Sequence, residues 1–448
     1  MDYIFFGLRY VLWEVAEEDE GDQFKVKLTA VLQAAPGSGP LALELNYHII
    51  GAMSGPESTT ADLLPNSEEE IEWSVDIRVP KSQVELWWPN GHGDQILYDI
   101  ELSVSLVDRK TRQAAGVADS IVYTRAFAFR TVELIQEPLA VGRAFYFRVN
   151  GRPIFMKGSN WIPAHVLPEQ VTAGYLRDLL GSAQEAHMNM LRVWGGGIYE
   201  LDAFYSIADE LGILIWQDFM FACSMYPADA ASLQNVAAEV RHQVRRLQRH
   251  ASVAVWAGNN ENEAALRQNW YGTDANYSVY KDDYIRLYVD TVRPLVLALD
   301  SSRSFVVSSP SNGLQSELDG YISANPGSNL YGDIHNYNYN LNTWDWRVYP
   351  KPRFCSEYGF QSFPSFELMQ TVSEATDWSF SSAWMQHRQH HPNGNLELPW
   401  QIHLNLYIDL SGLDTPEGLQ EFLYLAQIYQ GPLFYLYSYT GMEELGEQ

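Results

Sequence analysis

The stretch Ser252-Val-Ala-Val-Trp-Ala-Gly-Asn-Asn-Glu-Asn-Glu263 joins a short apolar segment to a turn that carries acidic side chains. A similar arrangement recurs about a hundred residues later in Pro352-Arg-Phe-Cys-Ser-Glu-Tyr-Gly-Phe360. Short apolar or β-forming runs that end in turn residues predict buried strands. In a (β/α)8 barrel the carboxyl ends of all strands open on one face, so acids that follow distant strands converge. We therefore expect Glu261 and Glu357 to meet in one cleft.

Two converging carboxylates suit the hydrolysis of a glycosidic bond. A retaining glycosidase needs one carboxylic acid that protonates the leaving oxygen and one carboxylate that attacks the anomeric carbon, about 5–5.5 Å apart. A single acid after a strand is more often a helix cap or the partner of an arginine. Here Asn260 can hold a sugar hydroxyl beside Glu261, and aromatic residues such as Trp344 can stack on a sugar ring near Glu357. Glu261 and Glu357 can divide the two roles, with Glu263 as the nearest rival for the acid.

The composition is that of a large globular protein with an acidic surface. The 448 residues are 46% hydrophobic and 13% aromatic, enough for a barrel of about 250 residues and a further β domain. The net charge of −27 argues against binding to nucleic acid or an anionic membrane, since both require clustered Lys and Arg. The two cysteines, Cys223 and Cys355, do not form a disulfide framework. No 18-residue apolar run and no signal peptide is visible.

Two patterns divide the chain. Residues 1–135 alternate apolar and polar positions, for example over 24–32 and 98–106, which predicts an immunoglobulin-like β-sandwich. Tyr146-Phe-Arg-Val-Asn-Gly151 has the Asn-Gly signature of a β-hairpin and leads into the next domain. Residues 136–430 alternate strands with amphipathic helices, which predicts a catalytic (β/α)8 barrel, and residues 431–448 form an atypical C-terminal tail.

The barrel pattern contains seven strands rather than eight. The expected strands are 154–157, 189–193, 213–216, 252–257, 304–308, 332–335 and a segment that ends at Glu357. Helices are expected near 170–187, 200–211, 235–250, 281–299 and 415–429. Where an eighth strand should follow, residues 431–441 are either a makeshift strand or an unrelated tail. The barrel is therefore possibly incomplete at its eighth strand.

Five motifs in this order resemble the lysosomal-type β-mannosidases of glycoside hydrolase family 2. They are Lys157-Gly-Ser-Asn-Trp161, Arg192-Val-Trp-Gly-Gly-Gly197, Trp216-Gln-Asp-Phe219 and the segments around Glu261 and Glu357. The resemblance implies a retaining exo-enzyme that removes terminal β-mannose, with Glu261 as acid/base and Glu357 as nucleophile. It further implies that Asn260 contacts the sugar 2-hydroxyl, and that the mannose subsite includes Arg192, Trp194 and Asp218.

Each of these subsite residues also has a structural interpretation. Arg192 could only bridge barrel strands, Trp194 could belong to the core, and Asp218 could cap the next helix. His335, at the end of the sixth strand, could orient a carboxylate or a hydroxyl, although a lone histidine there is more often structural. No spacing of His, Cys and Asp residues calls for a metal, and no cofactor is expected. The resemblance implies a lysosomal location and a β-mannoside oligosaccharide as the binding partner.

The chain departs from the family at both ends. Members usually begin with a jelly-roll domain and continue through an eighth strand into further β domains, so this chain resembles a truncated member whose own activity is weak or absent. Three hypotheses remain open: a β-mannosidase or its fragment, a non-catalytic sugar-binding module, and a family 2 enzyme for another β-glycoside. The natural aglycone and the oligomeric state are open as well.

Overall fold

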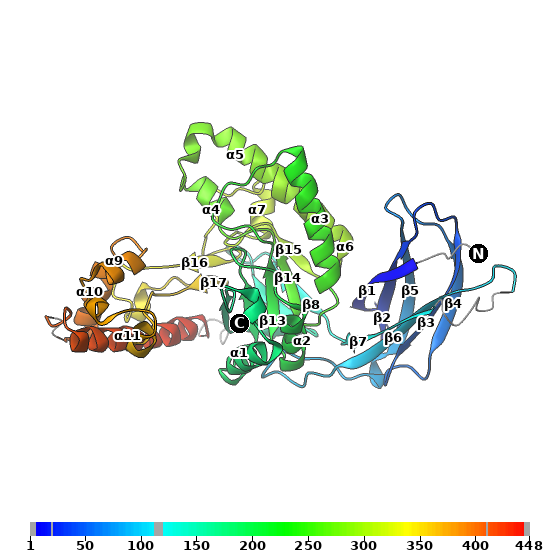
Figure 1. The fold of residues 1–448 in the computed structure, drawn as a ribbon. Coiled ribbons are helices and arrows are strands. Elements are labelled where there is room, and N and C mark those ends of the chain that lie inside the picture. The colour runs from blue at the N-terminus through cyan, green and yellow to red at the C-terminus, as the bar shows by residue number, and fades with distance from the viewer. Residues whose placement is uncertain (1–5, 19–20, 112–119, 409–410, 443–448) are drawn as a thin grey trace. The chain divides into compact units, whose positions relative to one another are not determined.

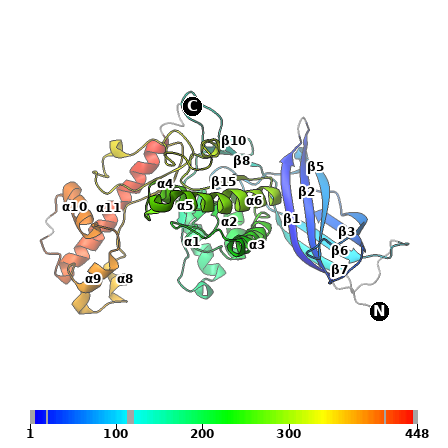
Figure 2. The same ribbon diagram turned by 90° about the horizontal axis from the view of Figure 1, so that it is seen from above.

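An antiparallel β-sandwich begins the part of the chain that the computed structural model describes, which comprises residues 6–18, 21–111, 120–408 and 411–442. One sheet has the order β1-β2-β5 and the other the order β4-β3-β6-β7. The strands are β1 (Phe6–Glu17), β2 (Gln23–Ala34), β3 (Leu41–Ile49), β4 (Glu57–Leu63), β5 (Glu70–Pro80), β6 (Tyr98–Leu106) and β7 (Ser120–Phe127). Figures 1 and 2 show the two sheets as separate layers.

The inward side chains of both sheets form a shared apolar core. Val26 and Leu28 of β2 and Leu43 and Ile100 of the facing sheet are fully buried in one cluster. Buried and more exposed positions alternate along most of β2 and β6, as the pleat of a strand with one wet face requires. The strands predicted over 24–32 and 98–106 are confirmed, whereas the immunoglobulin-like type of the sandwich stays a prediction.

A small three-stranded sheet connects the sandwich to the parallel sheet. It contains β8 (Val132–Ile135), β9 (Tyr146–Val149) and β10 (Arg152–Ile154). Strands β9 and β10 pair as an antiparallel hairpin, so the hairpin predicted from the sequence is confirmed. Both turn residues have positive φ, 49° for Asn150 and 77° for Gly151, a conformation that the Asn-Gly pair accommodates readily.

Five parallel strands follow, in the order β11-β12-β13-β14-β15. They are β11 (Gly158–Trp161), β12 (Met190–Val193), β13 (Leu214–Asp218), β14 (Val253–Ala257) and β15 (Ser304–Val306). The prediction of a first barrel strand over 154–157 is wrong, because Ile154 belongs to the β10 hairpin and the parallel strand starts at Gly158. The absence of a side chain at Gly158 is required there, since a Cβ would come within 1.7 Å of the Met190 oxygen on β12.

Amphipathic helices cover this sheet, as Figure 1 shows. Their apolar faces pack with the strands into a second core, which includes the fully buried Leu176, Phe204, Val244 and Trp256. The helices are α1 (Ala173–Glu185), α2 (Asp202–Leu211), α3 (Ala230–Leu247), α4 (Asn262–Arg267), α5 (Tyr277–Tyr284), α6 (Arg293–Leu299) and α7 (Leu314–Leu318). The helix predicted over 281–299 is interrupted between α5 and α6 by a π-helical segment, η5 (Ile285–Val292).

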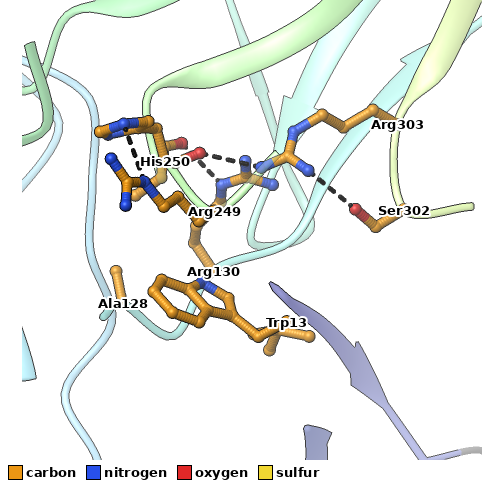
Figure 3. Close-up of a pocket in the computed structure, with 9 residues that line it drawn as sticks. Trp13, Ala128, Arg130, Arg249, His250, Ser302 and Arg303 are labelled. Atoms are coloured by element: carbon orange, nitrogen blue, oxygen red, sulfur yellow. Dashed lines mark hydrogen bonds between the residues drawn. The ribbon is translucent and has the colours of Figure 1, made fainter. Parts of the chain in front are cut away.

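Two buried arginines bind backbone oxygens at the start of β14, next to the segment that leaves the sandwich. Arg130 donates hydrogen bonds to the backbone oxygens of Ala251 (2.8 Å) and Val253 (2.7 Å), directly before and at the start of β14. Arg303 donates to the same Val253 oxygen and to the His250 oxygen, at 2.7 and 2.8 Å. Figure 3 shows these side chains converging beside Trp13 of β1. Burial removes water from Arg130 and lowers its pKa to about 9. The backbone oxygens of Ala251 and Val253 bind the guanidinium in place of that water.

Residues 327–448 form a second compact unit, separate from the unit made by residues 1–326. It contains a parallel pair, β16 (Ile334–Asn336) and β17 (Cys355–Tyr358), and the helices α8 (Phe366–Gln370), α9 (Ala383–Arg388), α10 (Gly394–Leu406) and α11 (Pro416–Met442). The described residues thus hold seven parallel strands, the number expected, as five in one unit and two in the other. The boundary falls inside the range predicted for the barrel domain.

Helix α11 includes the residues for which the sequence analysis considered an eighth strand. It runs from Pro416 to Met442, so residues 431–441 are helical, and residues 443–448 of the predicted tail lie outside the described residues. Leu419, Phe422 and Ala426 of α11 are buried in the core of the second unit. In the part of the chain that the structure describes, no helix combines the length and apolar character needed to span a bilayer.

Candidate active site

Glu261 lies just beyond the carboxyl end of β14, as predicted. Its backbone N–H donates to the Ser309 oxygen (2.7 Å), and the preceding residue, Asn260, forms parallel bridges with Ala222 and with Ser309. The loop is therefore held from both sides by segments that follow β13 and β15. Glu261 has a φ of 64°, in the left-handed region that costs a residue with a Cβ about 1–3 kcal/mol. Such strain is maintained because the neighbouring segments fix the backbone.

A buried ion pair lies at the ends of the adjacent strands. Arg192 of β12 donates to Asp218 of β13 through Nε (3.3 Å) and Nη2 (2.8 Å). Asp218 also accepts hydrogen bonds from the Gly195 backbone N–H and the Trp216 indole, both at 3.0 Å. Because parallel pairing places Arg192 opposite Trp216, the guanidinium reaches across to the end of the next strand. Asp218 does not cap the next helix, whose cap is Asp229.

The same guanidinium orients two asparagine side chains. Arg192 donates to the Oδ1 atoms of Asn160 on β11 (3.1 Å) and of Asn260 (2.8 Å). Three consecutive strands and the loop after β14 thus contribute polar side chains to one network: Asn160, Arg192, Asp218 and Asn260. Both interpretations of Arg192 are therefore compatible with its position, since it bridges strands and also lines the edge where Glu261 lies. Sequence reasoning did not single out Asn160, although it lies in one of the five motifs.

Trp194 follows β12 and is half-buried. Its ring covers Gly196, where an added Cβ would come within 2.1 Å of the indole. The Trp194 backbone N–H donates to the Trp161 oxygen at 3.2 Å, which fixes the start of the turn. The lack of a side chain at Gly196 therefore leaves room for the indole, just after β12 and the Arg192 network.

Cys223 is a contact of Glu261 that sequence reasoning missed. Its Sγ atom lies 3.1 Å from Glu261 Oε2 and accepts a hydrogen bond from Asn260 Nδ2 at 3.2 Å. Its backbone oxygen accepts a hydrogen bond from the Tyr271 hydroxyl. Burial raises the pKa of Tyr271, and the nearby Cys223 and Glu261 raise it further, so the phenol stays a neutral donor. The aromatic-rich segment around Cys223 was the only signal in the sequence.

Glu263 has a different environment from Glu261. It is fully buried, and its Oε1 accepts hydrogen bonds from the Ser323 backbone N–H (2.8 Å) and the Ser316 hydroxyl (3.3 Å). These contacts tie α4 to α7 and to the segment that follows it. The position favours a structural role for Glu263 and leaves Glu261 as the candidate acid in this unit.

The second unit carries the other predicted carboxylate. Glu357 lies within β17, one residue before its end, paired in register with His335 of β16, which agrees with the predicted strand that ends at Glu357. The His335 Nδ1 atom is 3.4 Å from Glu357 Oε2, and the Tyr337 hydroxyl donates to the same oxygen at 2.8 Å. His335 is thus placed to orient a carboxylate, one of its two predicted roles. Tyr337 was not predicted.

Trp344 also lies in the second unit, in contact with α11. Its ring stacks on Tyr429 with centroids 5.3 Å apart, and its indole N–H donates to the Tyr429 oxygen at 3.1 Å. These contacts place it beside the core of this unit, so its role in sugar stacking stays a prediction. The expected separation between Glu261 and Glu357 also stays a prediction, because the two units are described separately.

Comparisons with known proteins relate the chain to glycosidases. Residues 201–392 match the family described as Glycosyl hydrolases family 2, TIM barrel domain. The chain is 49% identical to the β-mannosidase of Rattus norvegicus over 351 residues, which are 78% of this chain and 39% of the relative. It is 40% identical to a probable β-mannosidase of Caenorhabditis elegans over 345 residues, 75% of this chain and 36% of the relative. The chain thus spans about two-fifths of the length of these relatives.

Two solved structures show the same architecture. The β-D-mannosidase from Dictyoglomus thermophilum superposes with a TM-score of 0.80 at 29% identity, covering 98% of this chain and 49% of that one. The exo-chitosanase CsxA of Amycolatopsis orientalis has a TM-score of 0.66 at 16% identity, covering 95% of this chain and 46% of that one. The second likeness is one of fold alone.

Proposed function

Because the chain is homologous to β-mannosidases and carries the TIM barrel domain of glycosyl hydrolases family 2, we propose that it is a retaining exo-β-mannosidase. Its substrates are oligosaccharides with a β-mannose residue at the non-reducing end. The observation that carries the proposal is the placement of Glu261 beside the network of Arg192, Asp218 and Asn260. This edge of the sheet combines an acid with donors and acceptors suited to sugar hydroxyls.

In the proposed mechanism the carboxylates act in two steps. Glu357 attacks the anomeric carbon while Glu261 protonates the leaving glycosidic oxygen, which gives a covalent glycosyl-enzyme. Glu261 then takes a proton from water, and this water displaces Glu357 from the sugar. The Tyr337 hydroxyl, 2.8 Å from Glu357 Oε2, keeps the nucleophile oriented. Asn260, held by Arg192, contacts the sugar 2-hydroxyl, with Trp194 and Asp218 shaping the same subsite.

Kinetics with the purified chain test this function. We expect slow hydrolysis of p-nitrophenyl β-mannoside, in line with the weak activity predicted from the sequence, with retention of the β-anomer in the first product seen by NMR. Glu261→Ala and Glu357→Ala should abolish this turnover. Circular dichroism establishes that each variant is folded. Hydrolysis of a β-glucosaminide or β-galactoside in preference would support another family 2 substrate, and mannoside binding without turnover, unchanged by Glu357→Ala, would support a non-catalytic module.

Two further experiments test which residue is the nucleophile and whether the enzyme works at acidic pH. A 2-deoxy-2-fluoro-mannosyl fluoride should label Glu357, and a label on another residue would contradict the assignment of the nucleophile. The family resemblance extends the proposal to the lysosome, and the first step needs a protonated acid, so we expect an acidic pH optimum. Activity that stayed flat up to pH 9 would contradict it.

A further inference from the structure

A chain of hydrogen bonds leads from the buried ion pair to the proposed acid. Arg192 Nη2 donates to Asn260 Oδ1 at 2.8 Å, and Asn260 Nδ2 donates to Cys223 Sγ at 3.2 Å. The sulfur then contacts Glu261 Oε2 at 3.1 Å. Since Arg192 has only donors, it fixes the amide oxygen of Asn260 toward itself and the amide N–H groups toward Cys223. The orientation of this chain is thus set at its cationic end.

This orientation determines what the thiol can do. The sulfur of Cys223 already accepts a hydrogen bond from Asn260, so its own S–H proton is available for Glu261. A thiol is both a weak donor and a weak acceptor. It can donate to Glu261 when the carboxylate is ionised and accept from it when the carboxyl is protonated. A group that both donates and accepts can therefore satisfy both states of the carboxyl without moving.

The backbone around the thiol is fixed as firmly as that of Glu261. Cys223 has a φ of 46°, in the left-handed region. Its N–H donates to the Asn260 oxygen at 3.0 Å, and its own oxygen accepts from the Tyr271 hydroxyl. Two strained residues on adjacent loops thus hold their side chains against each other, which is typical of a functional site.

From these contacts we propose that Cys223 is a positioning residue, whose thiol holds the Glu261 carboxyl in place in both protonation states of the catalytic cycle. This inference rests on the proposed function, since only a glycosidase that alternates Glu261 between acid and base needs such a partner. Protonation of the leaving oxygen by Glu261 then depends on Cys223 as well as on the two carboxylates.

The test compares Cys223→Ala with Cys223→Ser on mannosides that differ in leaving group. A poor leaving group such as an alkyl alcohol needs protonation by Glu261, whereas dinitrophenolate departs without it. We expect Cys223→Ala to lower kcat/KM about tenfold or more for the alkyl mannoside and much less for the dinitrophenyl mannoside. Cys223→Ser, which keeps a donor and an acceptor, should recover most of the loss. An equal loss on both substrates, or no recovery by serine, would overturn the proposal.

A second readout does not need turnover. A nearby carboxylate disfavours the thiolate, which is the form that reacts with iodoacetamide. Glu261→Gln should therefore speed alkylation of Cys223 several-fold at pH 8, as measured by peptide mass spectrometry, with Cys355 as the internal control. An unchanged Cys223 rate would refute the contact. If the folded wild type has no turnover, the proposed function fails and the catalytic role of Cys223 with it, while the alkylation rates still show whether the two groups are coupled.

Discussion

The buried Arg192–Asp218 pair offers a quantitative test of how the edge of the parallel sheet is held. Asp218→Asn keeps the shape of the side chain and removes its charge. Asp218 Oδ1 accepts from Arg192 Nε and Trp216 Nε1, and Oδ2 accepts from Arg192 Nη2 and the Gly195 N–H. An asparagine has one acceptor oxygen, so in either orientation its amide NH2 group faces two donors.

The expected cost follows from these contacts. Each buried donor left without an acceptor costs about 1–3 kcal/mol. Removing one partner of a buried ion pair costs about 3–5 kcal/mol, because the other charge stays buried, and Arg192 and Asp218 are 4% and 0% exposed. The two estimates describe the same loss, so we expect Asp218→Asn to lower the free energy of unfolding by about 3–5 kcal/mol. That is a large share of a typical stability of about 5–15 kcal/mol.

Urea unfolding followed by tryptophan fluorescence measures this change, since Trp216 itself bonds to Asp218. The matched control is Asp178→Asn, an exposed carboxylate on α1, for which we expect a change within about 0.5 kcal/mol. An Asp218→Asn variant that unfolds within about 1 kcal/mol of the wild type, at an unchanged urea dependence, would refute the reasoning.

Three other substitutions test separate parts of the fold. Gly158→Ala places a Cβ within 1.7 Å of the Met190 oxygen and should cost about 3 kcal/mol in urea unfolding, whereas Gly181→Ala, in open space on α1, should be neutral or stabilising. Burial opposes ionisation of Asp300, but Arg303 and three side-chain hydrogen bonds outweigh it, so its pKa lies below the usual 3.8. The ionised Asp300 therefore stabilises the fold above about pH 4, and this contribution is lost as the pH falls through the lowered pKa. Asp300→Asn should lower the urea midpoint most at pH 7 and less in acid, whereas a difference from the wild type that grew in acid would contradict this. Thr172→Ala removes the N-cap of α1 and should lower the free energy of unfolding by about 1 kcal/mol, with Thr172→Ser close to wild type in the same assay.

Much of the fold was predictable because it follows from local patterns. Alternation gave the sandwich strands near 24–32 and 98–106, and the Asn-Gly pair gave the hairpin. The parallel strands were found where apolar runs alternate with amphipathic helices. The first of them was displaced because both 154–157 and 158–161 are compatible with a strand, and only the pairing of Gly158 with Met190 distinguishes them. Residues 431–441 were predicted to be a strand or a tail, but they are helical, because a run of apolar and aromatic residues is compatible with both a strand and a buried helix.

The candidate site was predicted less completely. Glu261 and Asn260 were found because they follow a predicted strand, and Arg192 and Asp218 because they lie in motifs that resemble those of the family. Cys223 and Tyr337 were not, since neither residue belongs to a motif with known spacing. Their relevance comes from contacts across 38 and 20 residues of sequence, with Glu261 and Glu357 respectively.

The sequence alone determined the class of most segments, although not of 154–157 or 431–441, and it identified the two candidate carboxylates. These depend on side-chain periodicity and on which residue follows which strand, both of which are local properties. Only the tertiary structure decided that Arg192 holds Asp218 and Asn260 together, that Glu261 has left-handed backbone geometry, and that a thiol lies against its carboxylate. The physical reason is that hydrogen bonds and ion pairs depend on distances of about 3 Å between side chains, and parallel strand pairing sets those distances only after the sheet has formed.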